Sequence, residues 1–127
     1  MNITESEQKI LLLLWEEGKL STMEIVKKLE EDTGWTKHAV ISFLRRMEIK
    51  NLVKYEEQGR AKYYTAAVRK EEVATKQRGS LLETFYRGKI GVMISEMVSD
   101  NSLSDEDISE LRKLLDDLYQ GEVKDDN

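Results

Sequence analysis

Apolar residues recur along this chain first at helical and later at strand-like spacing, and the change divides it into predicted helices and strands. The first predicted helix begins after Thr4 and ends before Gly18. Thr4 and Glu7 have the spacing of a capping box, and Gly18 suits the left-handed position that ends many helices. The helix carries a dense apolar run: Ile10, Leu11, Leu13, Leu14 and Trp15. Such a run must lie at the centre of a core.

Two more helices are predicted directly after the first. Ser21 and Glu24 repeat the capping-box spacing at the start of the second helix, which ends near Gly34. Thr36 is the expected N-cap of the third helix, which runs to about Asn51. The third helix has a core-facing stripe at positions i, i+3, i+4 and i+7: Val40, Phe43, Leu44 and Met47. Three such helices with short joins form a helix-turn-helix in which the third is the recognition helix.

After the third helix the pattern becomes that of β-strands. The β-prone runs 52–57 and 61–65 flank a turn predicted at Gly59, which indicates a hairpin. A helix-turn-helix followed directly by a hairpin is a winged helix. Arg60 and Lys62 fall at the tip of this wing, where a wing meets the DNA backbone or minor groove.

From about Val68 the spacing is helical again. Further helices are predicted over 70–86, over 90–98 and from a Ser104 cap to Gly121, where a short acidic tail begins. Some 60 residues in three pieces do not easily close a core of their own. A second copy of the chain would bury their apolar stripes, and we expect a homodimer formed through Leu82, Phe85, Ile90, Met93, Ile94, Met97, Ile108, Leu111, Leu115 and Leu118. The alternative is that these helices fold back on the winged helix.

The predicted fold is mainly α with a small β-hairpin. A winged helix-turn-helix DNA-binding domain occupies 1–68, and a helical dimerisation region with the acidic tail occupies 69–127. The chain has no Cys and one His, which excludes disulfides, thiolate zinc sites and multi-histidine metal sites. It has no paired nucleophile and base and no glycine-rich phosphate loop, so we expect neither an enzyme nor a cofactor. No apolar run is long enough to span a bilayer, which predicts a cytoplasmic protein.

The net charge of −5 is unevenly distributed. Residues 36–64 contain seven Lys and Arg against three acidic residues, a local charge of +4. Residues 100–127 contain three basic against ten acidic residues, a local charge of −7. Because charges farther apart than about 8–10 Å are screened at physiological salt, the local basic patch suffices to attract phosphate.

The outer side of the third predicted helix carries the chemistry that reads a major groove. Arginine can bond two guanine acceptors at once, and an aliphatic side chain can contact a thymine methyl. The candidate DNA-binding residues are Thr36, Lys37, His38, Ile41, Ser42, Arg45 and Arg46 on the helix, with Arg60 and Lys62 on the wing. Two alternatives stay open: an ordinary charged surface helix, and a winged helix that serves as a protein-interaction module.

The order of parts resembles the BlaI/MecI family, the penicillinase repressors among the winged-helix transcription regulators. The resemblance covers nearly the whole chain, with no single motif highly specific. It rests on Leu14-Trp15, Glu24-Ile25-Val26, Trp35-Thr36, Leu44-Arg45-Arg46-Met47, Lys50-Asn51-Leu52-Val53, Lys62-Tyr63-Tyr64 and Glu110-Leu111-Arg112. It implies a dimeric repressor that binds a short inverted-repeat operator and controls β-lactam resistance or related stress genes.

The resemblance also implies a route of induction and shows two departures. In the family a membrane sensor with a zinc-protease domain responds to β-lactam, and the repressor is then cleaved in its dimerisation arm. The family's Asn-Phe cleavage pair falls on Glu96-Met97 here, which does not match. On the recognition helix, Ile41 stands where relatives often have a basic residue and Ala39 where Thr is usual. The copper-sensing branch uses cysteines and is excluded. The nearest rival is a PadR-like regulator with a ligand between the arms.

Overall fold

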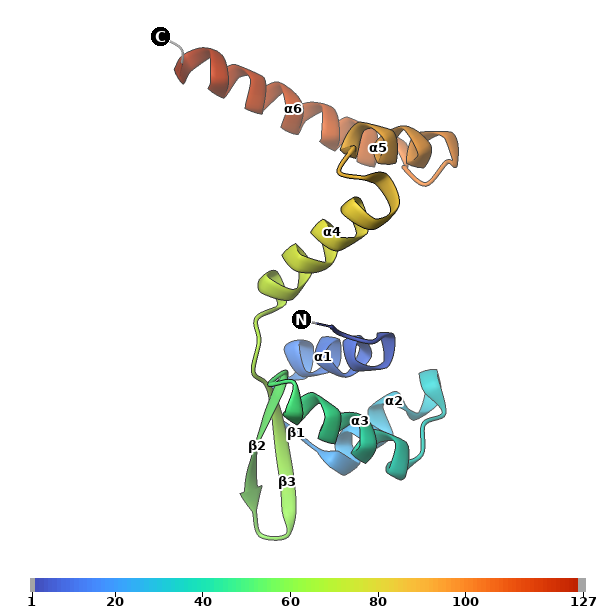
Figure 1. The fold of residues 1–127 in the computed structure, drawn as a ribbon, viewed down its shortest axis with the longest axis vertical. Coiled ribbons are helices and arrows are strands. Elements are labelled where there is room, and N and C mark those ends of the chain that lie inside the picture. Colours follow the sequence, from blue (N-terminus) through green and yellow to red (C-terminus); the bar gives the residue numbers. More distant parts are fainter. Residues whose placement is uncertain (1, 126–127) are drawn as a thin grey trace. The chain divides into compact units, whose positions relative to one another are not determined.

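The computed structural model describes residues 2–125, with side chains described as far as Gly121 (Figure 1). In chain order the elements are α1 (Glu5–Glu17), β1 (Leu20–Ser21), α2 (Thr22–Thr33), α3 (Lys37–Ile49), β2 (Val53–Gln58), β3 (Ala61–Ala66), α4 (Lys70–Tyr86), α5 (Ile90–Ser99) and α6 (Asp105–Asp125). One compact unit ends at Gln77 and a second begins at Arg78, so the division falls inside α4. The predicted class, mainly helical with a winged helix-turn-helix and further helices, is confirmed.

The N-terminal caps form as the sequence predicts. The Thr4 hydroxyl accepts a hydrogen bond from the Glu7 N–H at 3.2 Å, and the Thr4 N–H donates to the Glu7 carboxylate at 2.9 Å. Ser21 and Glu24 form the same reciprocal pair at the start of α2. Gly18 has the expected positive φ of 85°, although its ψ of −144° lies outside the left-handed helical region. These local signals determine the residues at which α1 and α2 begin.

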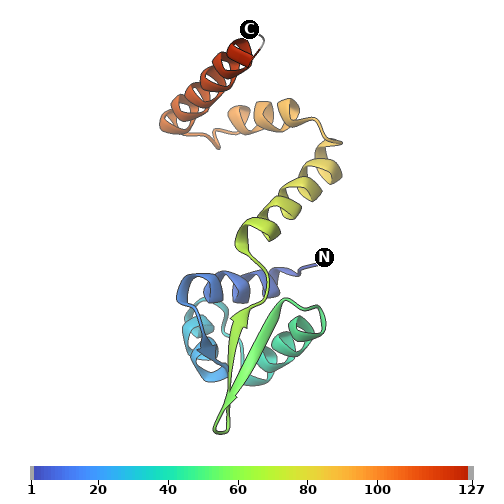
Figure 2. The same ribbon diagram turned by 90° about the vertical axis from the view of Figure 1, so that its left-hand side faces the viewer.

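The wing is a three-stranded sheet of order β1-β3-β2, and the predicted hairpin forms its larger part. Gln58 pairs with Ala61, so the turn consists of Gly59 and Arg60, with Gly59 at a φ of 65°. Only glycine adopts such a φ without strain, which explains the residue at this point. The hairpin extends past the helices of its own unit (Figures 1 and 2). The strand β1 was not predicted, because two residues carry no readable period.

The first unit has one core, to which each of its helices contributes its predicted apolar face. The buried apolar residues are Ile3, Ile10, Leu11, Leu14, Leu20, Ile25, Leu29, Val40, Leu44, Met47, Leu52, Val53, Tyr64 and Val73. Trp15 is half-buried, and its indole N–H donates to the Val68 carbonyl at 2.9 Å, which fixes the chain after β3. Phe43 departs from the predicted stripe because it is only half-buried and lies at the margin of the core.

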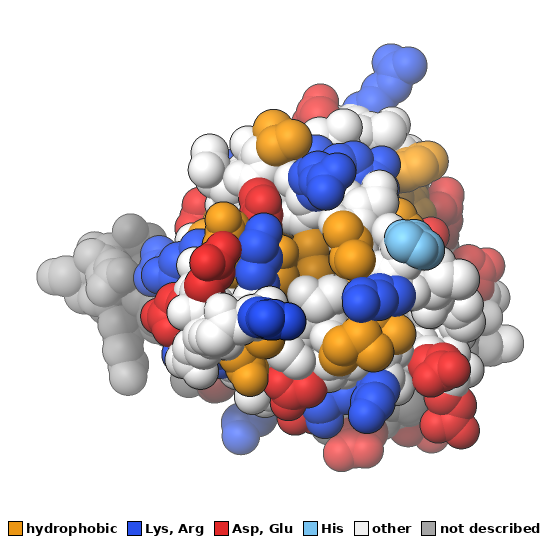
Figure 3. Space-filling model, turned by 90° about the horizontal axis from the view of Figure 1, so that it is seen from below, with side chains coloured by type: hydrophobic (Ala, Val, Ile, Leu, Met, Phe, Trp, Pro, Cys, Tyr) orange, Lys and Arg blue, Asp and Glu red, His pale blue; other side chains and the backbone are white. Residues whose placement is uncertain are grey.

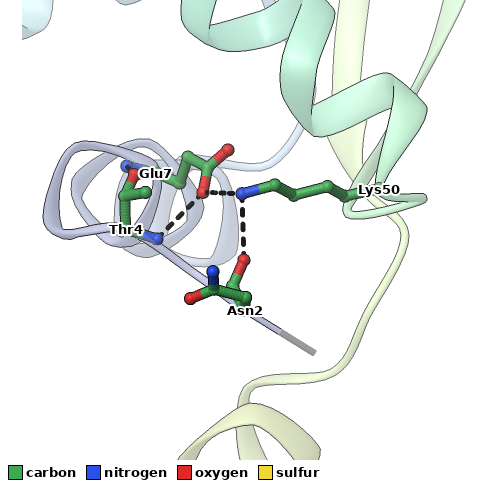
Figure 4. Close-up of polar contacts among 4 residues, drawn as sticks. All are labelled: Asn2, Thr4, Glu7 and Lys50. Carbon is green, nitrogen blue, oxygen red and sulfur yellow. Dashed lines mark hydrogen bonds and ion pairs between the residues drawn. The ribbon is translucent and has the colours of Figure 1, made fainter.

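An ion pair with a buried carboxylate joins α1 to the end of α3 (Figure 4). The Glu7 side chain is fully buried, and its Oε1 accepts from the Lys50 ammonium at 2.7 Å. The same ammonium donates to the Asn2 carbonyl at 2.9 Å. Burial raises the pKa of Glu7, but the hydrogen bonds from Lys50 and Thr4 outweigh it and hold the pKa below its ordinary value. The pair therefore ties the C-terminal end of α3 to the first turn of α1.

The second unit contains the end of α4 with α5 and α6. Arg87 and Gly88 end α4 with φ values of 52° and 80°. The predicted Ser104 cap forms, since its hydroxyl accepts from the Asp107 N–H at 3.0 Å. The prediction that the chain leaves the helix after Gly121 is wrong, because α6 continues to Asp125. A helical glycine costs only about 1 kcal/mol, which the hydrogen-bonded turns on both sides can tolerate.

Candidate nucleic-acid interface

The outer side of α3 is open to solvent. Lys37, His38, Ser42, Arg45 and Arg46 are all exposed, as the sequence predicts for groove-facing residues. Since the spacing of His38, Ser42 and Arg45 turns them away from the buried stripe of Val40, Leu44 and Met47, the same helix presents one side to the core and the other to solvent.

Thr36 has a structural task that limits its part in recognition. Its hydroxyl accepts a hydrogen bond from the Ala39 N–H at 3.2 Å and so caps α3. The residue is exposed, and the hydroxyl proton remains available to an outside acceptor. Thr36 therefore positions the first turn of α3 and keeps a free hydroxyl donor at the surface.

The structure brings the wing residues and the start of α3 around one hollow, which we call the wing groove. Its volume is about 490 Å³, and its walls carry the cations Lys37, Arg60 and Lys62 beside the half-buried Ile41. Lys and Arg side chains surround a patch of apolar side chains on the face seen from the hairpin side (Figure 3). Basic residues more than 20 positions apart in sequence thus act on a single surface.

Three residues at the start of α2 also line the wing groove, and they were missing from the sequence-based set. They are Ser21, Thr22 and Met23. The capping box revealed that α2 begins here, but the position of this end beside the wing depends on the pairing of β1 with β3. That pairing could not be predicted, so neither could the contribution of α2.

A hydrogen bond from Tyr64 on β3 to Glu48 on α3 joins this helix to the wing. Burial raises the pKa of Tyr64, and the hydrogen bond from its hydroxyl to Glu48 raises it further. The Arg45 charge acts in the opposite direction on the pKa of Tyr64. Arg45 lies one turn after Ile41, which lines the wing groove, so it is on the wing side of α3. On the wing itself the Lys62 ammonium lies 4.4 Å from the centre of the Tyr55 ring, which lies 5.7 Å from the Tyr64 ring. The Lys62 ammonium is therefore held over the Tyr55 ring, which packs beside Tyr64.

Arg46 lies against a different pair of rings. Its guanidinium carbon is 5.2 Å from the centre of the Phe43 ring, which meets the Trp35 ring edge to face at 4.8 Å. The adjacent arginines Arg45 and Arg46 thus have different surroundings, although the sequence pattern treated them alike.

The second unit leaves the apolar residues that the sequence assigned to dimerisation exposed or only half-buried. From Ala74 to Gly121 no side chain is buried, and the exposed fractions of Phe85, Ile90, Leu115 and Leu118 range from 56% to 73%. A hollow of about 330 Å³ between α5 and α6 is lined by Ile94, Val98, Leu103, Ile108, Leu111, Arg112, Leu115 and Asp116. This unit does not bury its own apolar stripes.

The pair that corresponds to the family's cleavage position lies inside α5. Glu96 accepts a hydrogen bond from the Tyr86 hydroxyl, which is the main reason that the pKa of Tyr86 is raised. The helix continues past Met97 to Ser99, so the non-helical link to α6 begins only at Asp100. Asn101 in this link has a φ of 59°.

Within residues 2–125 no group of three or more His, Cys, Asp or Glu side chains could hold a metal ion. No helix of the described part has the length and apolar character needed to cross a membrane.

Comparison with known proteins gives one family. The description of the matching family model is "Penicillinase repressor", and the match covers residues 3–117. A penicillinase repressor of Bacillus licheniformis is 24% identical over 115 residues, which are 91% of this chain and 90% of that protein.

Solved structures give the same fold. The DNA-binding domain of the repressor BlaI has a TM-score of 0.52 at 21% identity, over 56% of this chain and 87% of that one. The monomeric form of Bacillus licheniformis BlaI in complex with the blaP half-operator has a TM-score of 0.50 at 21% identity, over 57% and 88%.

Proposed function

The chain belongs to the penicillinase repressor family, and from this we propose that it is a homodimeric transcriptional repressor that binds an inverted-repeat operator in double-stranded DNA. The family consists of DNA-binding repressors and not of enzymes. Each protomer would read one half-site with α3 in the major groove and touch the flanking backbone with its wing.

The wing groove is the observation that carries the proposal. Lys37 from α3 and both wing cations line it, next to an exposed helix face with two arginines. We assign phosphate contacts to Thr36, Lys37, Arg60 and Lys62. Base contacts are assigned to His38, Ile41, Ser42 and Arg45. A helix with cations beside it and small polar residues at its centre matches the division between backbone and base contacts in protein–DNA complexes. The similar BlaI fold was solved with a half-operator, which supports the same use of this surface.

The exposed second unit supports the homodimer. We propose that the dimerisation residues predicted from the sequence are covered by the same residues of a second copy. Leu115 and Leu118 are 64% and 62% exposed, and α5 has no buried residue at all. A helix that is apolar over so much of its surface is stable in water only when another element covers it.

The replacement Arg60→Ala tests the DNA-binding surface. We expect it to weaken binding to an operator duplex and to an unrelated duplex by the same factor, because a phosphate contact carries no sequence information. We also expect the slope of log K against log salt to become flatter by about one unit. Fluorescence anisotropy across a salt series measures both quantities.

The matched control for Arg60→Ala is Lys28→Ala. Lys28 lies on α2 and pairs with Glu17 at 3.5 Å, away from the wing groove. Both variants lose one positive charge, but only the first should change the slope. If the two lost affinity equally, net charge and not the wing would explain the binding, and the assigned surface would be wrong.

We further propose that the regulated genes serve β-lactam resistance or a related stress response, because relatives of this chain are penicillinase repressors. Induction would then involve a membrane sensor-protease pathway that ends in cleavage of the dimerisation region. The cut would leave each winged helix to bind one half-site alone, without the gain from bivalent binding.

The position of the cut can be predicted from the helix boundaries. We place the cut between about Met93 and Ser102, a range that includes Glu96-Met97 at the family's position. Proteases act on non-helical chain, so we expect cleavage in the part of this range after Ser99, where α5 has ended. Mass spectrometry of the protein from β-lactam-treated cells would locate the new termini. Full derepression with an intact chain would contradict induction by proteolysis.

A further inference from the structure

A ladder of two aromatic rings supports one arginine of the recognition helix. Trp35 lies in the link before α3 and meets Phe43 edge to face at 4.8 Å. The Phe43 ring in turn lies 5.2 Å from the guanidinium carbon of Arg46. Both rings are half-buried and Arg46 is exposed, so the ladder runs from the margin of the core to the surface.

The ladder separates the two adjacent arginines. Neighbouring residues on an α-helix point about 100° apart, so Arg45 and Arg46 lie on opposite edges of the outer face, with Ser42 between them. Arg45 is on the edge near the wing, since it lies one turn after Ile41, which lines the wing groove. Arg46 is on the edge that carries Phe43.

A helix in a major groove has a central face toward the bases and two edges beside the phosphate backbones. The groove is about 12 Å wide and a helix with its side chains about 10–12 Å across, so a side chain held outward at either edge reaches a phosphate backbone, and one that turns toward the centre of the face reaches the bases. A guanidinium group that lies on an aromatic ring keeps its in-plane N–H donors free for a phosphate. Held in this way, it loses little side-chain freedom when it binds.

We propose that Phe43, supported by Trp35, is a positioning residue that holds Arg46 toward a backbone phosphate. Arg46 then strengthens binding to any sequence, and base recognition from this pair of arginines rests with Arg45. The proposal depends on the DNA-binding function proposed above and assigns the two arginines different roles within it. A leucine at position 43 could fill the margin of the core, so the core alone does not require a ring here.

A double-mutant cycle with Phe43→Leu and Arg46→Ala tests this role. The probes are an operator duplex selected from a random pool and a random-sequence duplex of equal length. We expect Arg46→Ala to weaken both complexes by one common factor and to flatten the salt slope by about one unit. Phe43→Leu should weaken both about two- to tenfold, because Arg46 without the ring must be ordered when it binds. In the Arg46→Ala background, Phe43→Leu should have no further effect.

Two controls separate positioning from simple packing. Phe43→Tyr keeps the ring and should retain wild-type affinity and salt slope. Thermal unfolding of each variant reports any loss of packing, which would not depend on the residue at position 46.

Arg45→Ala tests the role assigned to the other arginine. It should weaken the complex with the operator duplex more than the complex with the random-sequence duplex.

The outcomes distinguish this inference from the proposed function. Wild-type protein that binds neither duplex at low salt would refute the DNA-binding function and the inference with it. Wild-type binding with an equal effect of Phe43→Leu in both backgrounds would overturn the positioning role alone. Loss of operator affinity only, on Arg46→Ala, would make Arg46 a base-reading residue and would also overturn it.

Discussion

Leu118→Glu is expected to give a folded monomer that binds a full operator about 10²–10⁴-fold more weakly than the wild type. Leu118 is 62% exposed in a single chain, so the glutamate meets solvent there and α6 still forms. In the proposed dimer the same carboxylate would be buried without a partner, which costs several kcal/mol. Sedimentation at micromolar concentration measures the association state, and circular dichroism measures the helix content.

The DNA measurement for this variant uses two duplexes. On a duplex with one half-site, wild type and variant should bind equally, because the winged helix is unchanged. On a full operator only the wild type gains from holding both half-sites at once. A variant that lost half-site affinity as well would indicate a damaged fold and not a lost dimer.

Two other changes on α6 serve as controls. Gln120→Glu adds the same charge on the polar side of the helix and should leave the dimer intact, since position 120 is away from the apolar stripe. Leu111→Glu changes a half-buried residue that lines the hollow between α5 and α6, and it should unfold the second unit. A wild-type chain that sediments as a well-folded monomer would contradict the dimer directly.

The parts of the fold that the sequence predicts well depend on short-range interactions. Thr4, Ser21, Thr36 and Ser104 all cap helices as expected, because a cap involves residues only three positions apart. The hairpin was located by Gly59 for the same reason. The family resemblance, drawn from the order of such local features, is confirmed by the match over residues 3–117.

The missed features depend on residues that are far apart in sequence. The strand β1 is defined by its partner Tyr64, 44 positions after Leu20, and by nothing in its own two residues. The wing groove requires α2, α3 and the hairpin together. The periodic pattern placed Phe43 in the core stripe, but it does not show that Trp35 occupies the neighbouring space and turns the ring toward Arg46. Spacing gives the direction of a side chain and does not give its neighbours.

The ion pair between Glu7 and Lys50 is a further case, because the sequence showed Glu7 only as half of a capping box. Lys50→Met is expected to lower the free energy of unfolding by about 2–3 kcal/mol at neutral pH. The methionine preserves most of the packing of the lysine stem but removes the ammonium 2.7 Å from a carboxylate that is fully buried. Urea unfolding measures the loss.

Lys9→Met is the matched control for this change. Lys9 pairs with Asp32 at a similar distance of 3.1 Å, but both side chains are exposed, 37% and 67%. Water screens such a pair, so its loss should cost less than about 1 kcal/mol. Equal losses in the two variants would mean that burial of Glu7 has no energetic consequence.

The effect of Lys50→Met should depend on pH in a direction fixed by the pKa of Glu7. Because the folded protein lowers this pKa below 4.5, the pair stabilises the fold fully above pH 4.5, and the contribution is lost as the pH falls through the lowered value. Without Lys50, only the hydrogen bonds from Thr4 oppose the effect of burial on the pKa of Glu7, so Glu7 takes up its proton at a higher pH. The difference in the free energy of unfolding between the wild type and Lys50→Met should therefore become smaller as the pH falls.

Glu7→Gln in the Lys50→Met background keeps the capping box without the charge and should restore most of the lost stability at pH 7. If the difference in the free energy of unfolding stayed constant from neutral to acid pH, and Glu7→Gln restored no stability, the loss would come from the packing of the Lys50 stem and not from its charge.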